Sequence, residues 1–157
     1  MKFDLATLRK FRLFEQLNDR ELESLLEIAE EAVYEKGQWI FHESSLAVSF
    51  YLILEGKIEI KMTGGVVDEP MTMEMVGAGQ GFGWSAIAQP HTFTASALAV
   101  EKTRLIMFNG DLLRDLFKKN NYIGYCIMVE ISGMISRRLR RCQVAFLRQH
   151  QEHLIRS

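Results

Sequence analysis

The middle of the chain, from about residue 38 to residue 108, has the alternation and the turn residues of short β-strands, and this limits the possible folds. A continuous apolar run from Phe50 to Leu54 is typical of a buried strand. After a turn at Gly56, apolar and charged residues alternate from Lys57 to Met62, which predicts a hairpin with one solvated face. Alternation returns from Met71 to Met75. We therefore expect a compact all-β unit of short strands.

Helical patterns flank this unit on both sides. Asn18 and Glu21 have the spacing of a capping box, and the apolar residues of one helical face follow, at Leu22, Leu25, Leu26 and Ala29. Gly37 is expected to end this region, and a second helical region begins near Asn109. The pattern predicts one α+β domain over residues 1–157, with N-terminal helices in 1–36, the β unit in 37–108 and C-terminal helices in 109–157.

The last helical region carries a long apolar stripe. Its members follow one another at steps of four, four, three and four residues: Ile131, Ile135, Leu139, Cys142 and Phe146. One helix of this length cannot cover a small β unit over its whole length. We therefore expect a homodimer in which two such helices pair across a two-fold axis. The alternative is that the stripe packs on its own domain.

Composition excludes several classes of protein. No segment approaches the roughly 18 consecutive apolar residues that span a bilayer, so we expect no membrane contact and a cytoplasmic location. Cys126 and Cys142 lie on one expected helix, about 24 Å apart at 1.5 Å per residue, and cannot form a disulfide with each other. The four histidines lack the spacing of a metal site. We expect no catalytic residue, no metal and no cofactor.

Charge is distributed unevenly along the chain. Met1–Phe117 holds 11 basic and 18 acidic residues, a net charge of −7, whereas Lys118–Ser157 holds 8 basic and 2 acidic residues, a net charge of +6. The basic residues include a run formed by Arg137, Arg138, Arg140 and Arg141. Such a run can attract nucleic acid, but it is also typical of a solvated helix flank that pairs with the acidic part of the same protein.

A glycine-rich loop, Gly79–Ile87, is the most informative local feature. Glycine lets the backbone approach a ligand closely, and successive main-chain N–H groups at the start of a helix bind anions. No Lys or Arg occurs anywhere from Met62 to Glu101. The sequence therefore combines a loop of the phosphate-binding type with an absence of cationic side chains on both sides of it.

Several of these features together resemble the cyclic-nucleotide-binding domain of the catabolite-activator (Crp/Fnr-type) regulators, over about residues 13–149. They are Gly37–Phe41, the strands of Tyr51–Ile58, the loop after Phe82 and Gly83, and the long last helix. The glycines at positions 37, 56 and 83 are the most specific part of the resemblance. It implies an eight-stranded antiparallel β-roll, jelly-roll-like, with a long C-terminal dimerisation helix, and a loop that holds a cyclic nucleotide.

Two positions depart from the family pattern. The resemblance implies a Glu after the loop glycine, to bind the ribose, and an Arg ten residues after that glycine, to bind the phosphate. Here these positions are Trp84 and Phe93. Losing both charged anchors weakens binding by roughly 10²- to 10⁴-fold. We therefore do not expect cyclic AMP to bind in the usual way. Either the two rings fill the former pocket, or they line a site for a different ligand.

The residues expected to form a ligand site are those of the loop and its surroundings, with two that the resemblance adds from the last helix: Gly81, Phe82, Gly83, Trp84, Ser85, Ala86, Phe93, Thr94, Cys142 and Gln143. We expect a non-enzymatic ligand-sensing or regulatory module. The alternatives are a ligand-free dimerisation scaffold that binds a separate signalling protein, and a true cyclic-nucleotide receptor that uses backbone contacts. Direct DNA binding is not expected, because the chain ends before a winged helix-turn-helix.

Overall fold

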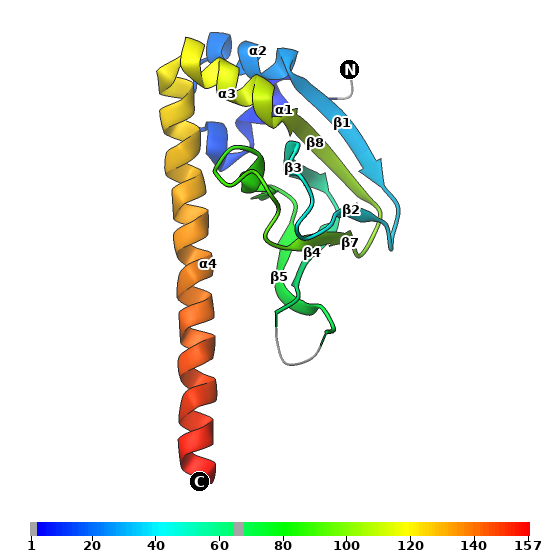
Figure 1. The fold of residues 1–157 in the computed structure, drawn as a ribbon. Coiled ribbons are helices and arrows are strands. Elements are labelled where there is room, and N and C mark those ends of the chain that lie inside the picture. The colour runs from blue at the N-terminus through cyan, green and yellow to red at the C-terminus, as the bar shows by residue number, and fades with distance from the viewer. Residues whose placement is uncertain (1–2, 65–67) are drawn as a thin grey trace.

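The computed structural model describes residues 3–64 and 68–157. The chain begins with α1 (Leu5–Arg9), the 3-10 turn η1 (Arg12–Phe14) and α2 (Asp19–Glu27). The predicted capping box is confirmed, since Asn18 Oδ1 accepts the Glu21 N–H at 2.9 Å and Glu21 Oε1 accepts the Asn18 N–H at 3.0 Å. These short helices gather with α3 (Gly110–Lys119) at one end of the molecule (Figure 1).

Eight strands in the described residues form two four-stranded antiparallel sheets, and the predicted antiparallel β-roll is confirmed. The first sheet has the order β1 (Ala29–Tyr34), β8 (Thr103–Asn109), β3 (Ser49–Glu55) and β6 (Gly81–Phe82). The second has the order β2 (Trp39–Phe41), β7 (Ser96–Ala99), β4 (Lys57–Met62) and β5 (Met71–Gly77). Both sheets contribute fully buried side chains to one core, among them Phe50, Phe82, Phe108 and Ile58.

The expectation that residues 1–36 are only helical is wrong, because Ala29–Tyr34 forms strand β1. This strand pairs with β8 from Ala29 opposite Phe108 to Tyr34 opposite Thr103. The segment has glutamates that suit a helix, but the ladder with β8 supplies backbone hydrogen bonds along its whole length. An ion pair of 3.1 Å between Arg104 Nε and Glu31 Oε1 joins the two strands. Tertiary pairing therefore overrides local preference here.

The expected hairpin of Phe50–Leu54 with the strand after it is also wrong. Strand β3 pairs with β6 and β8, whereas β4 pairs with β5 and β7, so the turn at Gly56 carries the chain from one sheet to the other. Gly56 has φ of +102°, and a Cβ there would lie 2.7 Å from the Lys102 carbonyl oxygen. Only glycine fits this crossing without displacing the backbone. Gly37 and Gly83 also have positive φ.

Strand β5 shows the predicted alternation, but its methionines face outward. Met71, Met73 and Met75 are 65%, 43% and 46% exposed. Glu74 and Val76 face inward, with the Glu74 side chain only 14% exposed. Alternation identifies the strand but does not say which face is covered. The inward face of β5 lies towards the last helix, α4 (Asn121–Arg156), as well as the core, and Glu74 on that face pairs with arginines of α4.

Two helices end the chain, α3 (Gly110–Lys119) and α4 (Asn121–Arg156), as expected for residues 109–157. Asn120 separates them with an extended backbone, and its side-chain oxygen accepts the N–H groups of Tyr122 and Ile123 at 3.1 and 3.3 Å. Helix α4 runs along one side of the sheets and continues beyond them (Figure 1). None of the described helices has the length and apolar character that crossing a membrane requires.

The predicted apolar stripe of α4 divides into two parts. Ile131 is fully buried in the domain's own core, so assigning it to the dimer face is wrong. Ile135, Leu139 and Phe146 are 38%, 57% and 67% exposed, and Cys142 is exposed as well. The first turns of α4 therefore pack on their own domain, and the later turns present an apolar face to solvent.

Candidate ligand site between the sheets and the last helix

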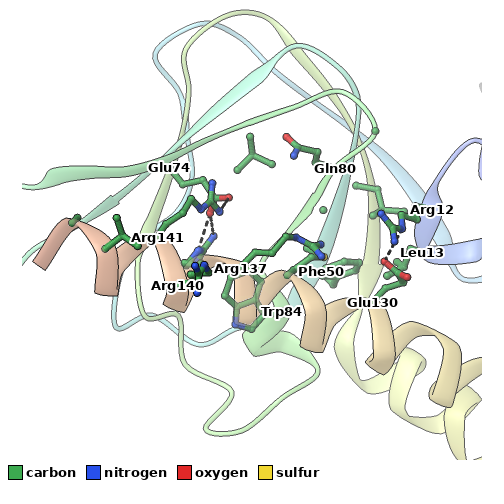
Figure 2. A pocket seen from close by; sticks show the side chains of 18 of the residues that line it. Arg12, Leu13, Phe50, Glu74, Gln80, Trp84, Glu130, Arg137, Arg140 and Arg141 are labelled. Atoms are coloured by element: carbon green, nitrogen blue, oxygen red, sulfur yellow. Dashed lines mark hydrogen bonds and ion pairs between the residues drawn. The ribbon is translucent and has the colours of Figure 1, made fainter. Parts of the chain in front are cut away.

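A cavity of about 900 Å³ lies between α4 and the inner side of the sheets (Figure 2). This volume falls within the range of pockets that hold small molecules and cofactors. Strand β3 provides Phe50 and Leu52, and β5 provides Glu74 and Val76. The wall on the α4 side consists of Glu130, Met134, Arg137, Arg138, Arg140, Arg141, Val144, Ala145 and Arg148, whose spacing of three or four residues puts most of them on one helical face.

Glu74 joins β5 to α4 across one end of this cavity. Its Oε2 accepts from Arg138 Nε at 2.8 Å and from a terminal nitrogen of Arg138 at 2.5 Å, and its Oε1 accepts from Arg141 at 2.6 Å. Burial acts to raise the pKa of Glu74, but the hydrogen bond from Arg141 and the charge and hydrogen bonds of Arg138 outweigh it and lower that pKa below its ordinary value. Glu74 is therefore ionised at neutral pH and holds both guanidinium groups.

Trp84 connects the glycine-rich loop to the same arginine. It opens the short turn η2 (Trp84–Ala86), which follows Gly83 in the left-handed conformation, and it lines the cavity. The guanidinium carbon of Arg138 lies 4.0 Å from the centre of the indole ring. A guanidinium over an aromatic face is attracted by the negative charge of the ring face. Arg138 thus binds the β5 carboxylate and the loop indole together.

The cavity carries a strong excess of positive charge. Six arginines and two glutamates line it, which leaves four uncompensated positive charges in a protein whose total charge is −1. Glu74 forms ion pairs with Arg138 and Arg141, and Glu130 Oε2 lies 3.5 Å from Arg12 Nε. Within residues 3–64 and 68–157, Arg137, Arg140 and Arg148 make no ion pair. Two of the four residues of the basic run, Arg138 and Arg141, therefore pair with an acidic residue of the same chain, as expected. Within the part of the chain that the structure describes, Arg137 and Arg140 do not.

A second, much smaller space lies beside the Gly83 loop, where the resemblance places a cyclic phosphate. It has a volume of about 20 Å³, close to the room that one water molecule needs. Phe93 is 5% exposed and stacks on Phe41 with ring centres 3.6 Å apart. Tyr51 stacks on Phe82 at 5.1 Å, and burial raises the pKa of Tyr51 to about 12, so this side chain stays neutral. Aromatic rings occupy most of this region.

The structure separates the expected site residues into four groups. Gly81 and Trp84 line the large cavity. The small space is lined by Phe82, Gly83, Ser85, Phe93 and Thr94, and also touches Trp84. Ala86 is buried, and its carbonyl oxygen accepts a hydrogen bond from Arg114. Cys142 and Gln143 lie beside Phe146 and Leu147 on another, exposed part of α4, and the structure does not bring them to the loop.

The residues that sequence reasoning missed are Glu74, Arg12 and the cavity-facing side of α4. Arg12 comes from η1, far from the loop in sequence, and no local pattern connects it to the site. Glu74 could have been noticed as an acidic residue in register with Val76 on the covered face of a strand. The described part of the chain contains no cluster of His, Cys, Asp or Glu that could hold a metal ion.

Comparison with known proteins agrees with this architecture. The sequence profile described as "Cyclic nucleotide-binding domain" matches residues 31–120. A crystal structure of a putative cyclic nucleotide-binding protein from Geobacter metallireducens GS-15 is 31% identical, with a TM-score of 0.77. The alignment covers 87% of this chain and 98% of that one. The chain therefore belongs to the cyclic nucleotide-binding domain family.

Two further relatives are longer than this chain. The cyclic AMP receptor protein of Thermus thermophilus is 28% identical over 135 residues, which cover 84% of this chain and 59% of that protein. The putative potassium channel protein RPA4233 of Rhodopseudomonas palustris is 28% identical over 127 residues, which cover 81% of this chain and 30% of that protein. The similarity thus concerns the binding domain that these proteins share with this chain.

Proposed function

We propose that this protein is a regulatory, non-catalytic module whose ligand binds in the large cavity between the sheets and α4, and not in the usual cyclic-nucleotide seat beside Gly83. The observation that carries the proposal is the contrast between the two spaces. The cavity against α4 has about 900 Å³, whereas the space beside the loop has about 20 Å³ and is lined by Phe93 and Phe82. A small molecule has room only in the first.

The absence of the usual anchors supports this location. Trp84 stands where a ribose-binding glutamate is expected, and its indole carries a guanidinium on its face. Phe93 stands where a phosphate-binding arginine is expected, and it is part of the aromatic core. If cyclic AMP bound beside Gly83, its ribose hydroxyl would face Trp84 and its phosphate would face Phe93, and neither ring offers a charged partner. Five of the six arginines that line the large cavity come instead from α4.

Helix α4 is the element that transmits occupancy in this proposal. One side of it lines the cavity, and its other side carries the exposed residues Ile135, Leu139, Cys142 and Phe146. Their steps of four, three and four residues are those of a coiled-coil seam. We propose that two copies pair through this seam and that a ligand changes their relative arrangement. A ligand does so only by binding one arrangement more tightly than the other.

A ligand panel tests the proposal. Cyclic mononucleotides, cyclic dinucleotides and small aromatic metabolites are screened by thermal shift, and hits are measured by calorimetry. We expect at least one hit whose binding is lost in Ala145→Trp, which fills the cavity, and kept in Thr94→Ala, which alters the small space. The opposite pattern would place the ligand beside Gly83. Stabilisation by no compound would instead support a scaffold without a ligand.

The alternative function, a true cyclic-nucleotide receptor, predicts a different result. It predicts micromolar binding of cyclic AMP or cyclic GMP that disappears in Gly83→Val, because Gly83 has φ of +80° and a Cβ there would lie 3.2 Å from the Ser49 carbonyl oxygen. Binding through the cavity predicts instead that the ligand depends on residues of α4. Comparing Gly83→Val with Ala145→Trp separates the two.

A further inference from the structure

We infer that the ligand of the α4 cavity is a nucleotide, or a similar planar molecule, that carries at least two phosphate groups. This inference rests on the proposed location of the ligand and adds its chemical class. Three properties of the cavity support it: the arginines without an acidic partner, the distance over which they are spread, and the apolar wall opposite them.

The arginines without acidic partners are the first argument. Arg137, Arg140 and Arg148 face the cavity, and none of them forms an ion pair with a described residue. Arg137 and Arg140 are three residues apart on the helix, so their like charges are neighbours and oppose helix formation. Glu74 relieves this repulsion only for Arg138 and Arg141. An anion in the cavity would neutralise the remaining charges.

The spread of these charges argues for more than one phosphate. Arg137 and Arg148 are 11 residues apart, which is about 16 Å along the helix axis. One phosphate group cannot contact guanidinium groups over this distance, even though each guanidinium can bind a phosphate with two parallel hydrogen bonds. The excess of four positive charges also exceeds the single charge of a cyclic mononucleotide. Two or more phosphates match both the length and the charge.

The opposite wall argues for a planar or apolar group in the same ligand. Phe50, Leu52 and Val76 line the cavity from the sheets, opposite the arginines, and Met134 and Val144 add apolar surface on the α4 side. Trp84 offers an indole at the edge (Figure 2). Aromatic and aliphatic walls of this kind favour a flat ring, whereas inorganic phosphate alone would leave them in contact with water.

Calorimetry at low salt tests this inference on the full chain. The probes are cyclic di-AMP, cyclic di-GMP and ATP, compared with cyclic AMP, cyclic GMP, adenosine and inorganic pyrophosphate. We expect at least one of the first three to bind at least about 10-fold more tightly than every member of the second group. Replacing Arg137 and Arg140 together by Gln should weaken that binding at least about 10-fold, because each charged hydrogen bond contributes strongly. Arg20→Gln, an exposed arginine outside the cavity, is the control and should change nothing.

Several outcomes would overturn the inference. Equal or tighter binding of a cyclic mononucleotide or of adenosine in the cavity would do so, although the proposed function would then stand. Equal losses in Arg20→Gln and in the double variant would show non-specific attraction, and tight binding of pyrophosphate would show that no ring is needed. Failure of all seven probes overturns the inference alone, and the proposed function fails only if the wider metabolite panel also gives no stabilisation.

Discussion

Arg138 of α4 covers the indole ring of Trp84, with 4.0 Å between its guanidinium carbon and the ring centre. The same guanidinium binds Glu74 of β5. The loop, the sheet and the last helix therefore meet at one side chain. Trp84 is the residue at the position where the resemblance implies a ribose-binding Glu, so the link between sheet and helix lies next to that position. A ligand in the cavity would contact this link directly.

Replacing Glu74 by Gln should weaken the attachment of α4. We expect the free energy of unfolding to fall by about 1–2 kcal/mol, the lower part of the range for charged hydrogen bonds, because Arg141 is 61% exposed and its interaction is screened by water. Chemical denaturation measures this change. Glu23→Gln, an exposed glutamate on α2, should be neutral. The same Glu74 variant should bind anionic ligands more tightly, and weaker binding would contradict the assigned charges.

Acid should break the same link. The pKa of Glu74 is lowered in the folded protein, so its ionised form contributes stability that is fully present above the unfolded value of 4.5. That contribution is lost as the pH falls through the lower, folded value. We expect the difference in stability between wild type and Glu74→Gln to be constant near neutral pH and to shrink below about pH 4.5. A difference that stays constant down to pH 3 would contradict this assignment.

Phe93→Ala should reveal a structural role of this ring beside Gly83. Phe93 is 5% exposed and stacks on Phe41, and removing such a ring costs about 3–5 kcal/mol when the cavity does not collapse. Denaturation curves measure the loss. At temperatures where circular dichroism shows the variant folded, a ligand that occupies the α4 cavity should keep its affinity. A small loss of stability together with lost binding would instead make Phe93 a ligand contact.

Leu139→Glu tests the seam on the outer side of α4. Leu139 is 57% exposed, so a charge there should change the stability of the folded chain by no more than about 0.5 kcal/mol. In a dimer it would bury a charge, and light scattering should report a monomer. Leu112→Glu, a comparable exposed change on α3, should remain dimeric. A wild type that is monomeric at tens of micromolar would refute the seam itself.

Cys142 provides an independent measurement of the same seam. It is exposed and lies between Leu139 and Phe146, whereas Cys126 is buried. Two parallel helices that pair across a two-fold axis would bring the two copies of Cys142 close together, within reach of a disulfide. Mild oxidation should therefore give a covalent dimer that Cys142→Ser abolishes. An antiparallel pairing centred away from Cys142, or a different interface, would leave the thiols too far apart to react.

The sequence was a good guide wherever a local rule sufficed. The capping box at Asn18, the turn glycine at position 56 and the helix start at Asn109 each depend on neighbouring residues, and each is present. The strand Ala29–Tyr34 and the partners of β3 and β4 were predicted wrongly. They depend on ladders between segments far apart in the chain, which alternation alone does not specify.

The candidate site was only half predictable, for the same reason. Spacing identified Trp84 and Phe93 as departures from the family pattern, and that assignment stays a prediction. The structure shows that both rings lie at the small space beside the loop. Five of the six arginines of the cavity come from α4, more than 50 residues after the loop, and Arg12 comes from η1. The absence of Lys and Arg near the loop gave no hint of them. The arginines of α4 reach the glycine-rich loop only because α4 packs against β5 in the folded protein.

The second half of helix α4 can act as a lever. Helix α4 is 36 residues long, or about 54 Å, and it is held against β5 through Arg138 and Arg141, near its middle. Its first turns are fixed, because Ile123, Ile127 and Ile131 are buried in the domain's own core. A bend of about 5° near Arg138 would move the distal end, about 27 Å further along, by about 2 Å. Small adjustments around Glu74 would thus be passed on to the exposed end of the helix.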